Sequence, residues 1–164
     1  MALSAIRTLP MPQITLNDCQ FHYTDQGSGP PLLLLHGLGS SEQDWEYQLP
    51  ALTPHYRVLC LDMRGHGGTD KTGKGYSIEL FARDCLAFIQ AMDLHKPHIV
   101  GLSMGGFASL HFGLNFSEMA HSLVVAGCGY GAGGDRDQWR KETGEIAQRF
   151  VDQGMESVSQ FYAY

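Results

Sequence analysis

The sequence has 164 residues, of which 43% are hydrophobic and 17% charged, and its formal net charge is −6. This length and composition predict a packed domain rather than a disordered chain. The negative charge leaves no basic surface for nucleic acid or anionic lipid, so neither is an expected partner. No apolar run comes near the about 20 residues of a membrane-spanning helix, so we expect no membrane association.

Cysteine usage indicates the compartment. The four cysteines form no CxxC pair and have no metal-ligand spacing with the histidines. Residues 1–10 also lack the long apolar core and cleavage site of a secretory signal. We therefore expect buried free thiols, a cytoplasmic location and no metal or other cofactor. The cysteines are Cys19, Cys60, Cys85 and Cys128.

The chain opens with a predicted hairpin and a buried strand. Residues 13–25 are typical of two short strands with a turn at Asn17 and Asp18, and the glycine- and proline-rich stretch 26–31 ends them. The four consecutive leucines 32–35 predict a strand that is buried on both faces of a parallel sheet.

A helix is expected next. Ser41 can cap a helix that runs through Trp45 and Leu49. Glu42 and Asp44 would lie in its first turn, where the helix dipole favours negative charge.

Strands and helices alternate through the middle of the chain. Strands are predicted over 56–61, 98–102 and 122–126, and helices over 78–92 and 105–116, the first of them capped by Ser77. This alternation predicts an α/β fold with a doubly wound, mostly parallel sheet.

The pattern changes after Cys128. Glycines are frequent from 129 to 134, and 135–164 is more polar and helical in pattern, with a single apolar face. We therefore divide the chain into residues 1–128, the N-terminal part of an α/β core, and residues 129–164, the start of a helical cap or lid. The apolar face consists of Trp139, Ile146, Phe150 and Val151.

A candidate nucleophile stands between the strand 98–102 and the next helix. Residues 101–105 read Gly-Leu-Ser-Met-Gly, with Ser103 at the centre. A nucleophile elbow needs a sharp, strained turn that exposes the serine hydroxyl, and small residues two positions away on each side relieve crowding. Gly101 and Gly105 meet that demand. We interpret Ser103 as a catalytic nucleophile rather than a bystander in a glycine-rich turn.

Two backbone N–H groups are candidates for an oxyanion hole. The Met104 N–H lies at the start of the helix, where the helix dipole is positive. The second donor is expected in the loop after the four leucines, and we select the Leu38 N–H because Gly37 permits a sharp turn there. His36 and Gly37 would then line the substrate pocket, with His36 bracing the loop by hydrogen bonding.

Three ordered segments resemble the α/β-hydrolase superfamily. They read Leu-Leu-His-Gly at 34–37, Leu-Asp-Met-Arg-Gly-His-Gly at 61–67 and Gly-Leu-Ser-Met-Gly-Gly at 101–106. Within the superfamily, the sequence resembles small cytoplasmic esterases, 3-oxoadipate enol-lactonases and related C–O and C–C bond hydrolases. The resemblance implies that Asp62, Arg64 and His66 hold a structural loop. It also implies a small-molecule ester, thioester or lactone substrate, because epoxide hydrolases and haloalkane dehalogenases use aspartate at the elbow.

The histidine of a catalytic triad is not apparent. The resemblance implies the order serine, acid, histidine along the chain. His111 would lie about 12 Å from the serine along the same helix. His98 and His121 precede their strands and belong to the opposite sheet edge. His36 and His66 stay as alternatives for the base at the correct edge.

The acid of a triad is not apparent either. Asp135 and Asp137 follow the last predicted strand, but the family places its acid after a later strand, so we assign both to the lid. We expect the remaining strands, the acid and the histidine to be missing from this chain. The strand 122–126 would then present an unpaired apolar edge, prone to self-association.

Two functional hypotheses follow. The first is a serine hydrolase that forms an acyl-enzyme on Ser103, with this particular chain near-inactive because the acid and histidine are absent. The alternative is a truncated isoform or pseudoenzyme that acts as a non-catalytic binding module.

Overall fold

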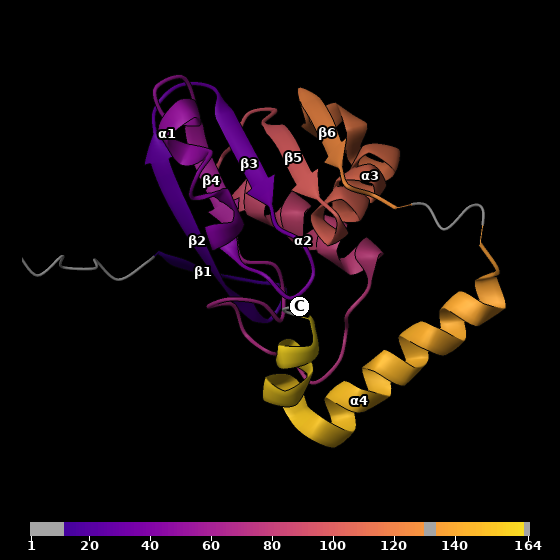
Figure 1. The fold of residues 1–164 in the computed structure, drawn as a ribbon. Coiled ribbons are helices and arrows are strands. Elements are labelled where there is room, and N and C mark those ends of the chain that lie inside the picture. Colours follow the sequence, from indigo (N-terminus) through magenta and orange to yellow (C-terminus); the bar gives the residue numbers. More distant parts are fainter. Residues whose placement is uncertain (1–11, 130–133, 163–164) are drawn as a thin grey trace, which may run out of the picture. The chain divides into compact units, whose positions relative to one another are not determined.

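The computed structural model describes residues 12–129 and 134–162 (Figure 1). The chain divides into two compact units between Cys128 and Gly129. The first unit is a sheet covered by helices, and the second is helical.

A six-stranded sheet forms the centre of the first unit, in the order β1-β2-β4-β3-β5-β6. The strands are β1 (Gln13–Leu16), β2 (Cys19–Gly27), β3 (Pro31–Leu35), β4 (Arg57–Leu61), β5 (His98–Leu102) and β6 (Ser122–Ala126). β2 runs antiparallel to β1 and β4, and the other pairs are parallel. The predicted α/β class with a mostly parallel sheet is confirmed.

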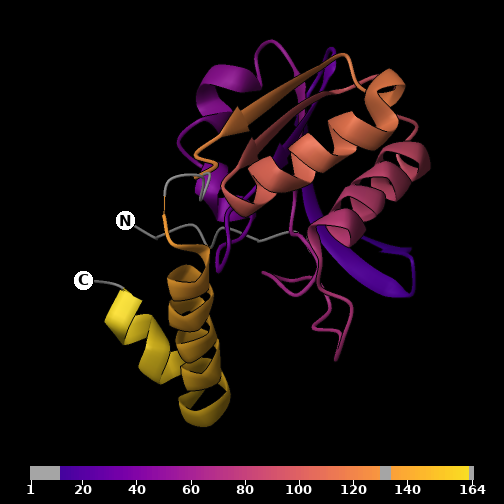
Figure 2. The same cartoon turned by 90° about the vertical axis from the view of Figure 1, so that its right-hand side faces the viewer.

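Helices cover both faces of the sheet. α2 (Ile78–Ala91) and α3 (Met104–Phe116) lie on one face, as Figure 2 shows, and η2 (Ser117–Met119) follows α3. The short elements η1 (Glu42–Trp45) and α1 (Leu49–Leu52) pack on the other face. Ser77 caps α2 as expected, because its Oγ accepts the Leu80 N–H at 3.2 Å.

The two central strands explain why the sheet is buried on both sides. Successive side chains of a strand point to opposite faces. In β3, Leu33 and Leu35 therefore join the core formed with α2 and α3, whereas Leu32 and Leu34 pack toward η1 and α1. Four of the five residues of β3, and likewise of β4, are buried. The uninterrupted leucine run is thus the signature of a strand covered on both faces.

The predicted single helix from Ser41 through Trp45 and Leu49 is wrong. Residues 42–45 form a 3₁₀ turn, and α1 begins separately at Leu49. Pro50 gives the physical reason, since it has no backbone N–H to bond the Glu46 carbonyl in a continuous helix. A proline is accepted in the first turn of a new helix, which is where α1 places it.

β6 forms one end of the sheet. Within the described residues it pairs only with β5, from His98 opposite Ser122 to Leu102 opposite Ala126. Val124 and Val125 are 50% and 40% exposed, and the strand carries neither charge nor proline. The predicted unpaired apolar edge is therefore present in the part of the chain that the structure describes.

The second unit consists of helix α4 (Arg136–Tyr162), which Gly154 divides at φ 76 and ψ 172. Asp135 caps this helix: its Oδ1 accepts the N–H groups of Asp137 and Gln138 at 2.9 and 3.2 Å. The carboxylate of Asp135 therefore serves the start of α4. Across residues 12–129 and 134–162, no helix is both long and apolar enough to cross a membrane.

Candidate active site

Ser103 lies on the turn that joins β5 to α3. Its backbone has φ 51 and ψ −109, a conformation that costs a non-glycine residue about 1–3 kcal/mol. The Ser103 N–H donates to the Ala126 carbonyl at 2.8 Å, and the Ser103 carbonyl accepts the Phe107 N–H at 2.9 Å. Ser103 is half-buried, and no hydrogen bond to its hydroxyl is formed among the described residues. The strained turn is thus held by its backbone, and the hydroxyl is left free.

Cys128 braces the same turn. Its thiol donates to the Ser103 carbonyl oxygen, with sulfur and oxygen 3.4 Å apart. Burial raises the pKa of this thiol, so it keeps the proton that the bond requires. All four cysteines are free thiols as expected, although Cys128 is half-buried and the other three are fully buried.

The two glycines that flank the serine are required by close backbone contacts. A Cβ on Gly101 would lie 2.1 Å from the Gly105 carbonyl oxygen. A Cβ on Gly105 would lie 2.3 Å from the Leu35 carbonyl oxygen and 2.8 Å from that of His36. Real Cβ atoms essentially never approach so closely. The predicted crowding with a neighbouring strand is confirmed for Gly105, which lies against β3, whereas Gly101 lies against the first turn of α3.

The loop that follows β3, residues 36–40, lies beside the turn. A Cβ on Gly37 would be 3.7 Å from the Ser103 Cβ. The His36 carbonyl accepts the Gly105 N–H at 3.1 Å, which ties the loop to the first turn of α3. The loop and the serine, distant in sequence, are therefore neighbours in the fold.

His36 braces this loop, as predicted. Its side chain is completely buried; Nε2 accepts the Met63 N–H at 3.0 Å, and Nδ1 lies 2.7 Å from the Gly37 carbonyl oxygen. Because Nε2 accepts a hydrogen bond, it carries no hydrogen of its own; Nδ1 therefore carries the ring hydrogen and donates it to the Gly37 carbonyl, and the ring is neutral. Burial lowers the pKa of His36 accordingly. With both nitrogens engaged, His36 offers none to Ser103.

The neutral state of His36 predicts a pH dependence of stability. The unfolded imidazole binds a proton near pH 6.5, whereas the folded one resists it. The contribution of His36 is therefore complete above pH 6.5 and declines as the pH falls below it, by at most about 1.4 kcal/mol per pH unit. We expect urea midpoints to fall from pH 7 to pH 5. His36→Gln should reduce the slope, and His55→Gln, at an exposed position, serves as control. Equal slopes in wild type and His36→Gln would contradict the assignment.

The two N–H groups predicted to form an oxyanion hole belong to Leu38, in the loop after β3, and to Met104, at the start of α3. Met104 is the first residue of α3, where a helix leaves its N–H groups without an intrahelical acceptor. The Gly37 carbonyl is bonded to the His36 ring. In a trans peptide unit the C=O and the N–H point in opposite directions, so the Leu38 N–H points away from that ring. Among the described residues, neither N–H donates a hydrogen bond. The Leu38 side chain is 78% exposed.

Asp62 organises the loop 62–75, as the resemblance implied. Its buried carboxylate accepts the N–H groups of Glu42 and Gly68, each at 2.7 Å, and lies 2.9 Å from His22 Nδ1. The Asp62 carbonyl accepts from the Thr69 hydroxyl at 2.6 Å. Asp62 therefore holds together β2, η1 and its own loop, and it acts structurally.

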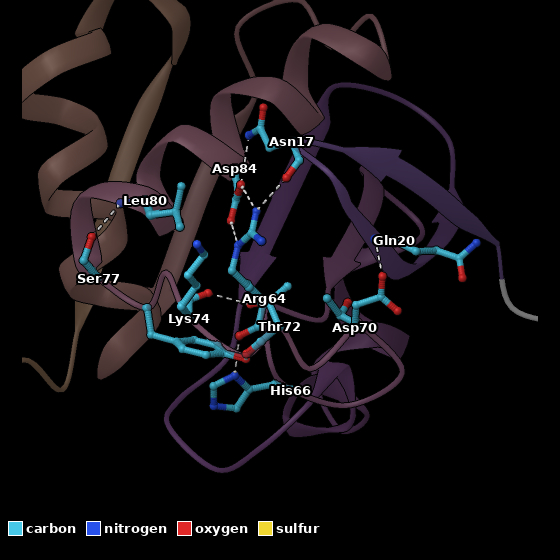
Figure 3. A network of polar contacts seen from close by, with 12 residues as sticks. Asn17, Gln20, Arg64, His66, Asp70, Thr72, Lys74, Ser77, Leu80 and Asp84 are labelled. Atoms are coloured by element: carbon cyan, nitrogen blue, oxygen red, sulfur yellow. Dashed lines mark hydrogen bonds and ion pairs between the residues drawn. The ribbon is translucent and has the colours of Figure 1, made fainter.

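Arg64 anchors the same loop to α2. Its guanidinium donates twice to the Asp84 carboxylate, at 2.8 and 2.9 Å, and both side chains are buried (Figure 3). Asp84 also accepts from the Asn17 amide at 2.9 Å. The Arg64 carbonyl lies 3.0 Å from His66 Nδ1. The expectation that Asp62, Arg64 and His66 hold this loop is confirmed.

None of the eight histidines is bonded to Ser103, and all of them lie among the described residues. His98 begins β5, contacts the His121 ring with 4.7 Å between centroids, and lies 2.7 Å from the Ser122 hydroxyl. Ser103 follows the other end of that strand, so the predicted separation is confirmed. His66 lies near the site, 5.1 Å from His36 between ring centroids. Among the described residues, no three metal-ligating side chains group together.

The sequence reasoning missed Asp44 as a residue of the site. Its Oδ2 accepts the Gly37 N–H at 3.3 Å, and its Oδ1 accepts from the Ser40 hydroxyl. Position in the chain suggested only a favourable interaction with a helix dipole. The contact depends on how η1 folds back over the loop, which residue spacing does not reveal.

Comparison with known proteins establishes the family. The sequence model of the alpha/beta hydrolase fold matches residues 30–156, and the chain belongs to this family. The predicted partial α/β-hydrolase fold is therefore confirmed.

Individual relatives are hydrolases. The chain is 39% identical over 109 residues to 2-hydroxy-6-oxo-6-(2'-aminophenyl)hexa-2,4-dienoic acid hydrolase of Metapseudomonas resinovorans. The aligned region covers 64% of this chain and 38% of that protein. The meta-cleavage product hydrolase of Pseudomonas fluorescens IP01 is 31% identical, with a TM-score of 0.68 over 71% of this chain and 44% of that one.

A solved enol-lactonase has the same fold. The enzyme from Burkholderia xenovorans LB400 has a TM-score of 0.80 and 24% identity, over 93% of this chain and 58% of that one. The chain spans less than half the length of the curated relatives it matches.

Proposed function

We propose that the protein containing this chain is a serine hydrolase that cleaves a small carboxylic ester, thioester or lactone through an acyl-enzyme on Ser103. The observation that supports the proposal most is the strained turn at φ 51, which leaves the Ser103 hydroxyl without a hydrogen bond among the described residues and lies beside the loop that contains Gly37. Hydrolase relatives support the reaction class. No step requires a cofactor, since the nucleophile and the oxyanion donors belong to the chain.

In the proposed reaction, the Ser103 oxygen attacks the carbonyl carbon while a base takes its proton. The N–H groups of Leu38 and Met104 donate to the oxyanion that forms, and His36 and Gly37 give the loop its shape. Collapse of the intermediate expels the alcohol, thiol or ring oxygen and leaves the acyl group on the serine. Water, activated by the same base, then releases the acid and restores the hydroxyl.

No described histidine is hydrogen-bonded to Ser103; of the two alternatives at this sheet edge, His66 has its Nδ1 3.0 Å from the Arg64 carbonyl and forms no hydrogen bond with the serine. Neither His36 nor His111 meets the requirement for a base, because the first has no free nitrogen and the second lies about 12 Å along the α3 axis from Ser103. We propose that the acid and the histidine come from sequence outside this chain, and that residues 129–164 begin a cap that shapes the substrate pocket. The four free thiols support a cytoplasmic location.

Hydrolysis assays test the proposal. The longest natural chain that contains this sequence should hydrolyse a short-chain p-nitrophenyl ester, a thioester or a simple lactone, and Ser103→Ala should lower kcat by at least about 10⁴-fold. Ser117→Ala, at the end of α3, is the control and should retain activity. Activity that persists in Ser103→Ala would refute the nucleophile. Including a 2-hydroxy-6-oxo-dienoic acid tests the substrate class named for the Metapseudomonas relative.

A non-catalytic binding module is the second candidate. The lack of a described histidine bonded to Ser103 favours it for the 164-residue chain taken alone. Loss of a triad histidine costs serine hydrolases about 10⁴-fold or more. The isolated chain should therefore hydrolyse esters near the background rate, and rapid turnover by it would assign the base to a residue within the chain.

We also propose that the isolated chain self-associates through the β6 edge. An open strand edge presents unpaired N–H and C=O groups, and charged residues normally protect such edges. Val124→Lys should lower the sedimentation-equilibrium mass toward that of one chain. Leu114→Lys, which adds the same charge at a 74% exposed position on α3, is the matched control and should not. A monodisperse wild-type monomer would contradict the proposal.

A further inference from the structure

One carboxylate connects the two ends of the loop 36–40. Asp44 lies on η1 and is half-buried. It accepts the Gly37 N–H near the start of the loop and the Ser40 hydroxyl at its end. Gly39, with φ +75, makes the turn between them, and a Cβ built on it would meet no atom within 4 Å apart from its chain neighbours. The two hydrogen bonds of Asp44 therefore restrain the turn at Gly39, a position where an added side chain would find little to pack against.

The peptide that Asp44 holds is the one that lies against the serine. The position of a Cβ on Gly37 is 3.7 Å from the Ser103 Cβ and 3.9 Å from Asp44 Oδ2. The carbonyl of the same peptide unit, from His36, accepts the Gly105 N–H at 3.1 Å. This peptide unit is thus fixed at its N–H by Asp44 and at its C=O by α3.

The next peptide unit carries the candidate oxyanion donor. Its carbonyl, from Gly37, is bonded to His36, and its N–H belongs to Leu38. Two consecutive peptide units are therefore held, one by Asp44 at its N–H and the next by His36 at its carbonyl. Since each peptide unit is rigid, the Leu38 N–H takes its direction from the bonded Gly37 carbonyl, and the bond from Asp44 fixes the adjoining unit against which Gly37 turns.

We propose that Asp44 is a positioning residue that orients the Leu38 N–H toward the oxyanion. This inference rests on the proposed function. A carboxylate suits the role because it can accept from Gly37 and Ser40 at once, and charge-assisted bonds are about twice as strong as neutral ones. The negative charge of Asp44 disfavours a second negative charge on a nearby oxyanion. The hydrogen bonds that Asp44 accepts from the Gly37 N–H and the Ser40 hydroxyl offset part of this repulsion.

Two variants separate the acceptor from the charge. Asp44→Asn keeps one acceptor oxygen and removes the charge, whereas Asp44→Ala removes both acceptors. In the active protein, Asp44→Ala should lower kcat by about 10–100-fold with little change in KM, because a small misplacement of a donor acts in the transition state. The kcat of Asp44→Asn should lie between that of Asp44→Ala and that of the wild type. Glu46→Ala, which removes an exposed acid two residues along, is the matched control and should retain kcat.

Amide hydrogen exchange provides a readout that does not need catalysis. In the ¹⁵N-labelled 164-residue chain, Asp44→Ala should accelerate exchange at Gly37 by at least about tenfold and shift the Leu38 amide resonance. Amides of α2 should be unchanged, which excludes general unfolding. Unchanged Gly37 and Leu38 amides would overturn the inference even if the protein is a hydrolase. An inactive wild-type enzyme would instead remove the proposed function, and the exchange result would still decide whether Asp44 holds the loop.

Discussion

Gly105→Ala is expected to destabilise the 164-residue chain by at least about 3 kcal/mol, or to prevent folding. The added methyl would lie 2.3 Å from the Leu35 carbonyl oxygen and 2.8 Å from the His36 carbonyl oxygen. Both obstacles are backbone atoms of β3 and the loop after it, which cannot change rotamer. Overpacking that forces backbone shifts typically costs 1–3 kcal/mol or more. Here the shift would also break the bond from the Gly105 N–H to the His36 carbonyl.

Gly113→Ala on the same helix provides the matched control. A Cβ there would meet Leu123 Cδ1, the far end of a flexible side chain, at 2.4 Å. Alanine also favours a helix over glycine by about 1 kcal/mol. Urea denaturation should therefore place Gly113→Ala near wild type and Gly105→Ala far below it. Equal midpoints for the two variants would show that α3 does not approach β3 as closely as described.

Arg64→Met is expected to cost about 3–5 kcal/mol of folding free energy. The substitution leaves the Asp84 carboxylate buried, with the Asn17 amide as its remaining side-chain partner. Removing one member of a buried ion pair is strongly destabilising because an uncompensated charge stays in the core. The loop 62–75 would also lose its attachment to α2. Chemical denaturation of the 164-residue chain at neutral pH measures the loss.

The double variant distinguishes the buried charge from the loss of packing. Arg64→Met combined with Asp84→Leu removes both charges, and apolar replacement of a buried pair is often neutral or stabilising. We expect the double variant to recover most of the stability that Arg64→Met loses. A double variant that is less stable than Arg64→Met would mean that the ion pair contributes net stability beyond the cost of burying its charges.

Local sequence patterns predicted the central elements well. The strands 98–102 and 122–126 agree residue for residue with β5 and β6, because short apolar runs bounded by glycine or proline leave little freedom in their limits. The leucine run at 32–35 was equally informative, since burial on both faces demands apolar residues without alternation. Pro50 was a usable signal that the prediction of a single helix over 41–49 overlooked.

The candidate site was predictable where it depends on backbone geometry. Gly101 and Gly105 stand at fixed offsets from Ser103 because any side chain there would collide with backbone atoms, so the constraint is visible in the sequence. The contacts of Asp44 and Cys128 with the loop and the turn join elements that are distant in the chain. Such contacts depend on the packing of η1 and β6, for which residue spacing holds no signal.

If the Ser103 hydroxyl is the nucleophile, an active-site-directed reagent should attach to it covalently. The longest natural chain containing this sequence would be treated with a fluorophosphonate, digested and analysed by tandem mass spectrometry. We expect one adduct, on the peptide that carries Ser103, and no adduct in Ser103→Ala. An adduct on a different residue, or labelling that is undiminished in Ser103→Ala, would contradict the assignment of Ser103 as the nucleophile.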